Sequence, residues 1–230
     1  MKMQIGVGTI SLILTAALMP NAAEALSTTV NCPAQSIAAA VNAGFDEIAI
    51  VGTCTEDVGI QQDDVTLQGG TVIGEITVNG ARRVTIQDMT IRGDGTPGKN
   101  GIVVINGAAV TLSAVTVDGA TTGIVINQGS SEIVDSTIKN NTSSGIDFDE
   151  GGYGLVSNST IQNNTDLGVH IGHSSSGNHI LGNPLGVSVD FSGSTTFPEF
   201  SPGVCLVGAA ARFLAMDLRD RLCPPTVLTM

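Results

Sequence analysis

The sequence predicts an all-β solenoid, in which successive coils of one chain stack on one another. The stretch "VTIQDMTIRG" at residues 84–93 alternates apolar and polar side chains, as a half-buried strand does, and "VTLSAVTVDG" at residues 110–119 repeats it. Anchored on a threonine, five such repeats follow one another at steps of 19, 26, 21 and 23 residues. A coil of about 22 residues cannot bury its inner face alone, so stacking of coils is expected.

The first strand of each repeat carries columns of like residues. The anchors are Thr71, Thr90, Thr116, Thr137 and Thr160. One place after each anchor stand Val72, Ile91, Val117, Ile138 and Ile161, and four places before it stand Leu67, Ile86, Leu112, Ile133 and Val156. We expect both apolar columns to lie on one face of a strand, directed into the core. Three places after each anchor stand Gly74, Gly93, Gly119, Asn140 and Asn163. Glycine and asparagine enter the left-handed region most readily, so this column predicts a turn.

A second strand is expected after each turn. It reads "GIVV", "GIVI", "GIDF" and "GVHI", beginning at Gly101, Gly123, Gly145 and Gly168. Each repeat leaves room for a third strand. A β-sandwich is the alternative, but it would need hairpin turns and no fixed long period.

The N-terminus has the pattern of a signal peptide over residues 1–25. Lys2 precedes an apolar run that ends in Ala23-Glu24-Ala25, a small-x-small cleavage pattern, so we expect export to the periplasm, cell surface or medium with maturation before Leu26. A membrane anchor is the alternative, although the run is short for a spanning helix. The mature chain would keep a net charge of −12, from 8 basic and 20 acidic residues. Such a surface excludes nucleic acid as a partner and disfavours membrane insertion after signal removal.

A disulfide and a short helix are expected at the start of the mature chain. Cys32 and Cys54 are the preferred disulfide, because an exported protein meets an oxidising compartment. They flank "PAQSIAAAVNAG", which we expect to form a helix that begins after Pro33 and ends at Gly44. We expect this helix to cap the first coil. The strand "EIAIVG" follows.

The threonine–isoleucine–turn ladder, the asparagines at 140 and 163, and the "SIAAAVNAG" helix together resemble a known architecture. They are similar to the right-handed, single-stranded parallel β-helix of the pectate-lyase-like superfamily, over roughly residues 30–190. The resemblance implies a β-helix domain over residues 26–190 with a short N-terminal capping helix. That superfamily includes polysaccharide lyases and hydrolases, phage tailspikes, surface adhesins, and periplasmic proteins that mature the copper sites of nitrous-oxide reductase. The fold alone selects none of these functions.

Residues 191–230 depart from the repeat and are expected to form an irregular or helical tail. Apolar residues at helical spacing, Leu206, Ala210, Phe213, Leu214 and Leu218, favour a C-terminal capping helix. A truncated or frame-shifted reading frame would produce the same abrupt change. Cys205 and Cys223 could pair here, but nothing local determines their geometry.

The residues required for known superfamily chemistry are sparse. A uronate lyase needs calcium bound by carboxylates and an arginine or lysine base. Lys139 is the only lysine or arginine between residues 100 and 200, and we interpret it as a solvated turn charge. Arg82, Arg83 and Arg92 are likewise interpreted as solvated surface residues. The motifs of pectin hydrolases do not occur as a set.

The sequence therefore favours a non-catalytic exported module that recognises a polysaccharide or another cell-surface partner. The alternatives are a polysaccharide lyase or glycoside hydrolase, and a periplasmic metal-handling protein. No cofactor is certain, although a divalent cation such as calcium fits the carboxylates. Aromatic stacking on sugars has little support, because the chain has no tryptophan, one tyrosine, Tyr153, and a phenylalanine, Phe148, at an inward position.

Asparagines recur in the turns of two repeats. These residues are Asn140, Asn141, Asn163 and Asn164, and the sequence "NNT" that contains them matches a glycosylation sequon twice. Side-chain amides that hydrogen-bond from coil to coil explain them more simply, and we favour that interpretation.

One column in the second strand changes from aliphatic to ionisable. It reads Val103, Val125, Asp147 and His170, and stacking at about 4.8 Å would bring the last two into contact. Asp149 would lie on the same face about 7 Å from Asp147, within the separation of inverting glycosidase carboxylates. Glu150 and His173 would fall in a matching turn. We predict that Asp147, Asp149, Glu150, His170 and His173 form the functional face. Asp147, Asp149 and His170 are the candidates for catalysis, the whole cluster for a divalent cation, and a hydrated acidic patch is the remaining alternative.

Overall fold

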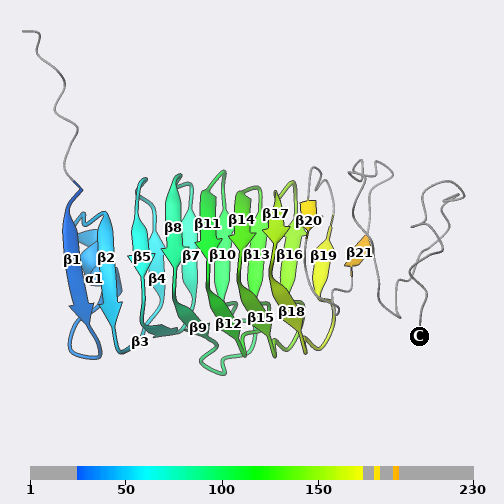
Figure 1. Ribbon diagram of the computed structural model, residues 1–230, viewed down its shortest axis with the longest axis horizontal. Helices are drawn as coiled ribbons and strands as arrows, with labels where there is room; N and C mark the ends of the chain where they lie inside the picture. The colour runs from blue at the N-terminus through cyan, green and yellow to red at the C-terminus, as the bar shows by residue number, and fades with distance from the viewer. Residues whose placement is uncertain (1–24, 173–178, 182–188, 192–230) are drawn as a thin grey trace, which may run out of the picture.

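The computed structural model describes residues 25–172, 179–181 and 189–191. The predicted signal peptide up to residue 24, His173 and the tail from residue 192 with Cys205 and Cys223 lie outside the described residues. The chain winds into a coil whose strands stack side by side along the long axis of the molecule (Figure 1). The described part includes one helix, α1 (Ile37–Asn42), and no helix in it is long and apolar enough to cross a membrane.

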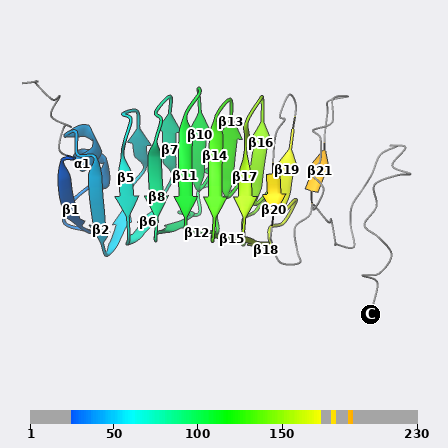
Figure 2. The ribbon, with the colours of Figure 1, turned by 45° about the horizontal axis from the view of Figure 1, so that its top comes forward.

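Three parallel sheets form the walls of the coil, as the turned view in Figure 2 also shows. The eight-stranded sheet contains β1 (Ser27–Asn31), β2 (Glu47–Val51), β5 (Thr66–Gln68), β8 (Val84–Gln87), β11 (Ala109–Ser113), β14 (Ser130–Val134), β17 (Tyr153–Ser157) and β20 (His179–Leu181). The six-stranded sheet contains β3 (Thr53–Thr55), β6 (Thr71–Ile73), β9 (Thr90–Arg92), β12 (Thr116–Asp118), β15 (Thr137–Lys139) and β18 (Thr160–Gln162). The seven-stranded sheet contains β4 (Val58–Ile60), β7 (Ile76–Asn79), β10 (Ile102–Ile105), β13 (Ile124–Asn127), β16 (Ile146–Asp149), β19 (Val169–Ile171) and β21 (Val189–Phe191).

The expected stacking is confirmed, and the predicted threonine anchors pair in register from β6 to β18. The placement of both apolar columns on one strand face was wrong. Leu67 lies in β5 and Val72 in β6, which belong to different sheets. A turn separates such strands in later coils, with Asp88, Ala114 and Asp135 at φ between 53° and 54°. If the two columns lay five residues apart on one straight strand, their side chains would point to opposite faces. The intervening turn directs both columns inward.

The asparagine turns are confirmed as a ladder. Asn140 and Asn163 both have φ of 56°, in the left-handed region. The Asn141 side-chain amide donates to Asn164 Oδ1 at 2.8 Å, while Asn141 Oδ1 accepts from the backbone N–H of Ala120 at 3.0 Å. Asn141 is only 1% exposed, so these bonds satisfy a buried amide from one coil to the next.

The glycine that precedes each second strand is required for close packing between coils. A Cβ atom on Gly145 would lie 2.6 Å from the carbonyl oxygen of Gly168, 2.6 Å from Ile161 Cγ2 and 2.7 Å from Asn164 Nδ2. Gly123 has the same relation to Gly145, at 2.5 Å. The glycine column therefore exists because the neighbouring coil and the inward isoleucine occupy the space of a side chain.

Replacing Gly145 by alanine should accordingly lower the free energy of unfolding by about 1–3 kcal/mol, because the added methyl group overpacks the coil. Gly59, in β4, is the matched control, since a Cβ there meets nothing within 4 Å. Gly59→Ala should be neutral or slightly stabilising. Urea denaturation of both variants measures the difference, and equal effects would contradict the packing argument.

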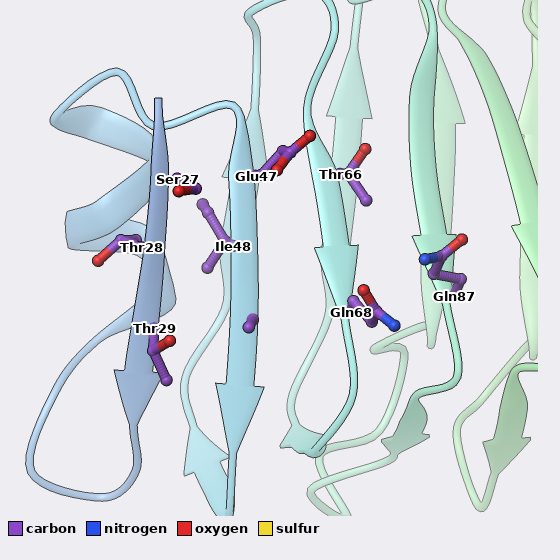
Figure 3. A pocket seen from close by; sticks show the side chains of 9 residues that line it. Ser27, Thr28, Thr29, Glu47, Ile48, Thr66, Gln68 and Gln87 are labelled. Carbon is purple, nitrogen blue, oxygen red and sulfur yellow. The ribbon is translucent and has the colours of Figure 1, made fainter. Parts of the chain in front are cut away.

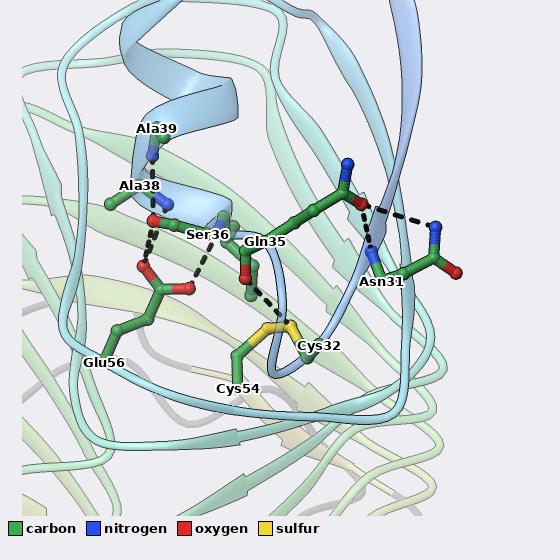
Figure 4. The surroundings of a disulfide bond; sticks show 9 residues. Asn31, Cys32, Gln35, Ser36, Ala38, Ala39, Cys54 and Glu56 are labelled. Atoms are coloured by element: carbon green, nitrogen blue, oxygen red, sulfur yellow. Dashed lines mark hydrogen bonds between the residues drawn. A yellow bond between two sulfur atoms is a disulfide. The ribbon is translucent and has the colours of Figure 1, made fainter.

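The N-terminal end is closed by α1, which packs against β1, β2 and β4 and buries Ile37 and Val41. The helix begins at Ile37 rather than directly after Pro33, because Ser36 is its N-cap and accepts from the Ala39 N–H at 3.1 Å. Glu56 strengthens this start by accepting from the N–H groups of Ile37 at 2.8 Å and Ala38 at 3.2 Å (Figure 4).

The predicted disulfide between Cys32 and Cys54 is present beside this helix start (Figure 4). Cys32 follows β1, whereas Cys54 lies in β3 and is 2% exposed. The bond therefore connects the capping segment covalently to the first complete coil.

Candidate functional site

The predicted column on the outer surface of the seven-stranded sheet is present in the expected register. Val103 pairs with Val125, Val125 with Asp147, and Asp147 with His170, on β10, β13, β16 and β19. All four side chains are half-buried and alternate with fully buried neighbours, so they point outward from the coil. We call this outer surface the seven-stranded face.

Asp147 and His170 form a direct contact across neighbouring coils. His170 Nδ1 lies 2.7 Å from Asp147 Oδ1, and the two side chains are 23% and 26% exposed. An ionised carboxylate only accepts hydrogen bonds, so the tautomer of His170 that carries a proton on Nδ1 is the one that would donate to it. The contact fixes the orientation of the imidazole ring on the face.

Asp149 lies near the same pair. Its Oδ1 accepts from the backbone N–H of Glu150 at 2.9 Å. A Cβ atom on Gly172 would meet Asp149 Oδ1 at 2.6 Å and His170 Cε1 at 3.3 Å, so Gly172 lies between the two side chains. Glycine is therefore the residue that fits this position, because a side chain here would clash with the Asp149 carboxylate.

Glu150 lies beyond the strand and is exposed, with φ of 45° in the turn after β16. The predicted cation site needs several ligand atoms at one point. Among the described residues, the only group of three or more potential ligand side chains within 4.8 Å is Cys32, Cys54 and Glu56, and its two cysteines form the disulfide. The structure thus joins Asp147 with His170 and places Asp149 beside them, while His173 lies outside the described residues.

Apolar and amide side chains continue the face toward the N-terminus. Ile105, Asn127 and Asp149 form a second outward column in register, parallel to the first. Ile105 is half-buried, like Val103 and Val125. The face therefore combines an aliphatic area with a polar end. Ile105 and Asn127 were not predicted as part of it, although the period-two alternation of the second strand was the available signal.

A polar network that the sequence pattern did not predict lies at the start of this sheet. Lys99 Nζ contacts Asp57 Oδ1 at 2.9 Å and Asp94 Oδ2 at 2.8 Å, joining the loop before β10 to an earlier coil. Hydrogen bonds from Lys99 and then from Thr96 lower the pKa of Asp94 to about 2, and the bond from Lys99 is the main cause that lowers the pKa of Asp57. The long step of 26 residues between two anchors was the available signal for this loop.

Two other cations form ion pairs with carboxylates of neighbouring coils. Arg83 forms ion pairs with Asp63 and Asp64, and Lys139 Nζ lies 3.9 Å from Asp118 Oδ2 on the six-stranded sheet. Arg92 also lies on the six-stranded sheet, in β9. Lys139 is partly exposed, as expected for a solvated charge, but it lies in strand β15 and not in a turn, so that part of the prediction was wrong.

Residues 74–197 match a family model described as "Right handed beta helix region". This match covers more than half of the 230 residues. The chain belongs to the right-handed β-helix family. No match was found among curated proteins or solved structures. The family confirms the predicted handedness, and the three parallel sheets are consistent with the pectate-lyase-like superfamily.

Proposed function

We propose that this right-handed β-helix is an exported module that binds a polysaccharide or another cell-surface component through the seven-stranded face, without cleaving it. The observation that carries the proposal is the change along one outward column from Val103 and Val125 to the Asp147–His170 pair. A sugar has an apolar C–H surface and a hydroxyl rim. The aliphatic area would contact the C–H surface of the sugar, and the carboxylates, imidazole and Asn127 amide would hydrogen-bond its hydroxyl groups.

Binding is favoured over lyase chemistry by the placement of the bases. Arg92 and Lys139 both lie on the six-stranded sheet. Lys99 stands three residues before β10 of the seven-stranded sheet, but hydrogen bonds from its ammonium to Asp57 and Asp94 raise its pKa. A lysine held in its protonated form is a poor acceptor for the proton that a lyase must remove.

The prediction is that Asp147→Ala combined with His170→Ala weakens binding to the recognised glycan at least tenfold, a loss of about 1.4 kcal/mol. Isothermal titration against a panel of neutral and uronate oligosaccharides measures this. Thr116→Ala combined with Thr137→Ala, on the outer surface of the six-stranded sheet, is the matched control and should leave binding unchanged.

Unchanged binding in a folded Asp147/His170 double variant would remove the seven-stranded face from consideration. New unsaturated or reducing ends in the same incubations would instead establish a lyase or a hydrolase. Metal analysis of the purified chain tests metal handling, and fractionation of expressing cells tests export.

A further inference from the structure

A groove of about 570 Å³ lies on the outer surface of the eight-stranded sheet, near its N-terminal end (Figure 3). Residues of β1, β2, β5 and β8 line it. Its volume lies within the range of ligand sites in proteins. The groove is on a different sheet from the seven-stranded face.

Two rows of outward side chains form this groove. One row runs Thr29, Ala49, Gln68 and Gln87 across four neighbouring strands, and the other runs Ser27, Glu47 and Thr66. Neighbouring strands lie about 4.8 Å apart and the rows about 6.7 Å apart, so the polar groups form a regular grid. Ala49 has the smallest side chain in its row, which leaves the hollow between Thr29 and Gln68.

The polar groups of the groove are available to a ligand. Within the part of the chain that the structure describes, the side chains of Glu47, Gln68 and Gln87 make no hydrogen bond to another residue. A glutamine amide offers one acceptor and two donors, which suits adjacent hydroxyl groups. None of the nine described residues that line the groove is a lysine, an arginine or an aromatic residue.

Glu47 determines the charge that the groove accepts. It forms no ion pair with any described residue, and the whole chain carries a net charge of −12. An anionic sugar would be repelled, whereas an ammonium group would be attracted to this unpaired carboxylate.

We propose that the groove binds a short oligosaccharide that bears a free amine. The ammonium group lies at Glu47, and sugar hydroxyls lie against the Gln68 and Gln87 amides. A lysine-rich peptide would satisfy Glu47, but it offers the Gln68 and Gln87 amides only its backbone groups, whereas a sugar offers several hydroxyl groups at adjacent positions. The groove therefore favours an amino sugar over a cationic peptide.

The test is titration of the full purified chain with a glucosamine trimer at about 0.15 M salt, where exposed charges beyond about 8 Å are screened. Glu47→Gln should weaken binding at least tenfold. Glu132→Gln is the matched control, because Glu132 is exposed in the same outward column, three strands beyond Thr66. Ala49→Leu, which fills the hollow at an exposed position, should also remove binding without changing the melting temperature.

Three results would overturn the proposal. Equal losses for Glu47→Gln and Glu132→Gln would mean general attraction of a cation to an acidic protein. Equal binding of the N-acetylated trimer would remove the role of the amine, and equal Glu47-dependent binding of trilysine would assign the groove to a cationic peptide. Because the Asp147/His170 variant leaves this groove intact, failure here is distinguishable from failure of the seven-stranded face.

Discussion

Ile138→Ala is expected to lower the free energy of unfolding by about 2–5 kcal/mol, the largest effect of any single truncation proposed for this chain. Ile138 is 0% exposed and pairs in register with Val117 on one side and Ile161 on the other. Its Cγ2 atom would lie 2.6 Å from a Cβ on Gly123, so it packs directly on the backbone of the preceding coil. Because rigid backbone surrounds the site, the cavity left by alanine can collapse only partly.

Lys139→Ala is the control at the adjacent position. The Lys139 side chain is 33% exposed and lies 3.9 Å from Asp118. Surface ion pairs contribute little, so its loss should cost less than about 1 kcal/mol. Chemical denaturation of both variants measures the contrast, and similar losses would show that the assigned inward register is incorrect.

Cys32→Ser is expected to destabilise the protein by about 3 kcal/mol, because the disulfide closes a loop with a sequence separation of 22 residues in the unfolded chain. The loss should be concentrated at the N-terminal end, since the bond connects the segment before α1 to β3. Loosening α1 would expose Ile37 and Val41, both buried now.

Thermal denaturation with and without reductant provides the measurement for this disulfide. Reductant should bring the wild type to the melting temperature of Cys32→Ser and leave that variant unaffected. An unchanged melting temperature of Cys32→Ser under oxidising conditions would contradict a stabilising role for the bond.

The sequence alone predicted the solenoid, its handedness by resemblance, the Cys32–Cys54 disulfide and the register of Asp147 beside His170. These features follow from periodicity, because each coil repeats the same contacts with its neighbour and a column in the sequence becomes a column in space. The same reasoning predicted that Phe148 is buried, and it is 0% exposed.

Only the tertiary structure decided how three sheets share each coil. A single left-handed residue, such as Asp88 or Ala114, moves a strand to another sheet and reverses the facing of every residue after it. The odd spacing of five residues between the two apolar columns was the available signal for the bend, because on one straight strand the columns would face opposite ways.

Complementary packing across coils was also invisible in the sequence. Gly154 accommodates the ring of Phe148, since a Cβ there would lie 3.1 Å from Phe148 Cε1 and 2.3 Å from the carbonyl oxygen of Ser131. The groove over Ala49 similarly depends on neighbours about 20 residues apart along the chain. Sequence patterns identify which residues repeat, but the volume left between coils depends on side chains that meet only after the chain has closed its turns.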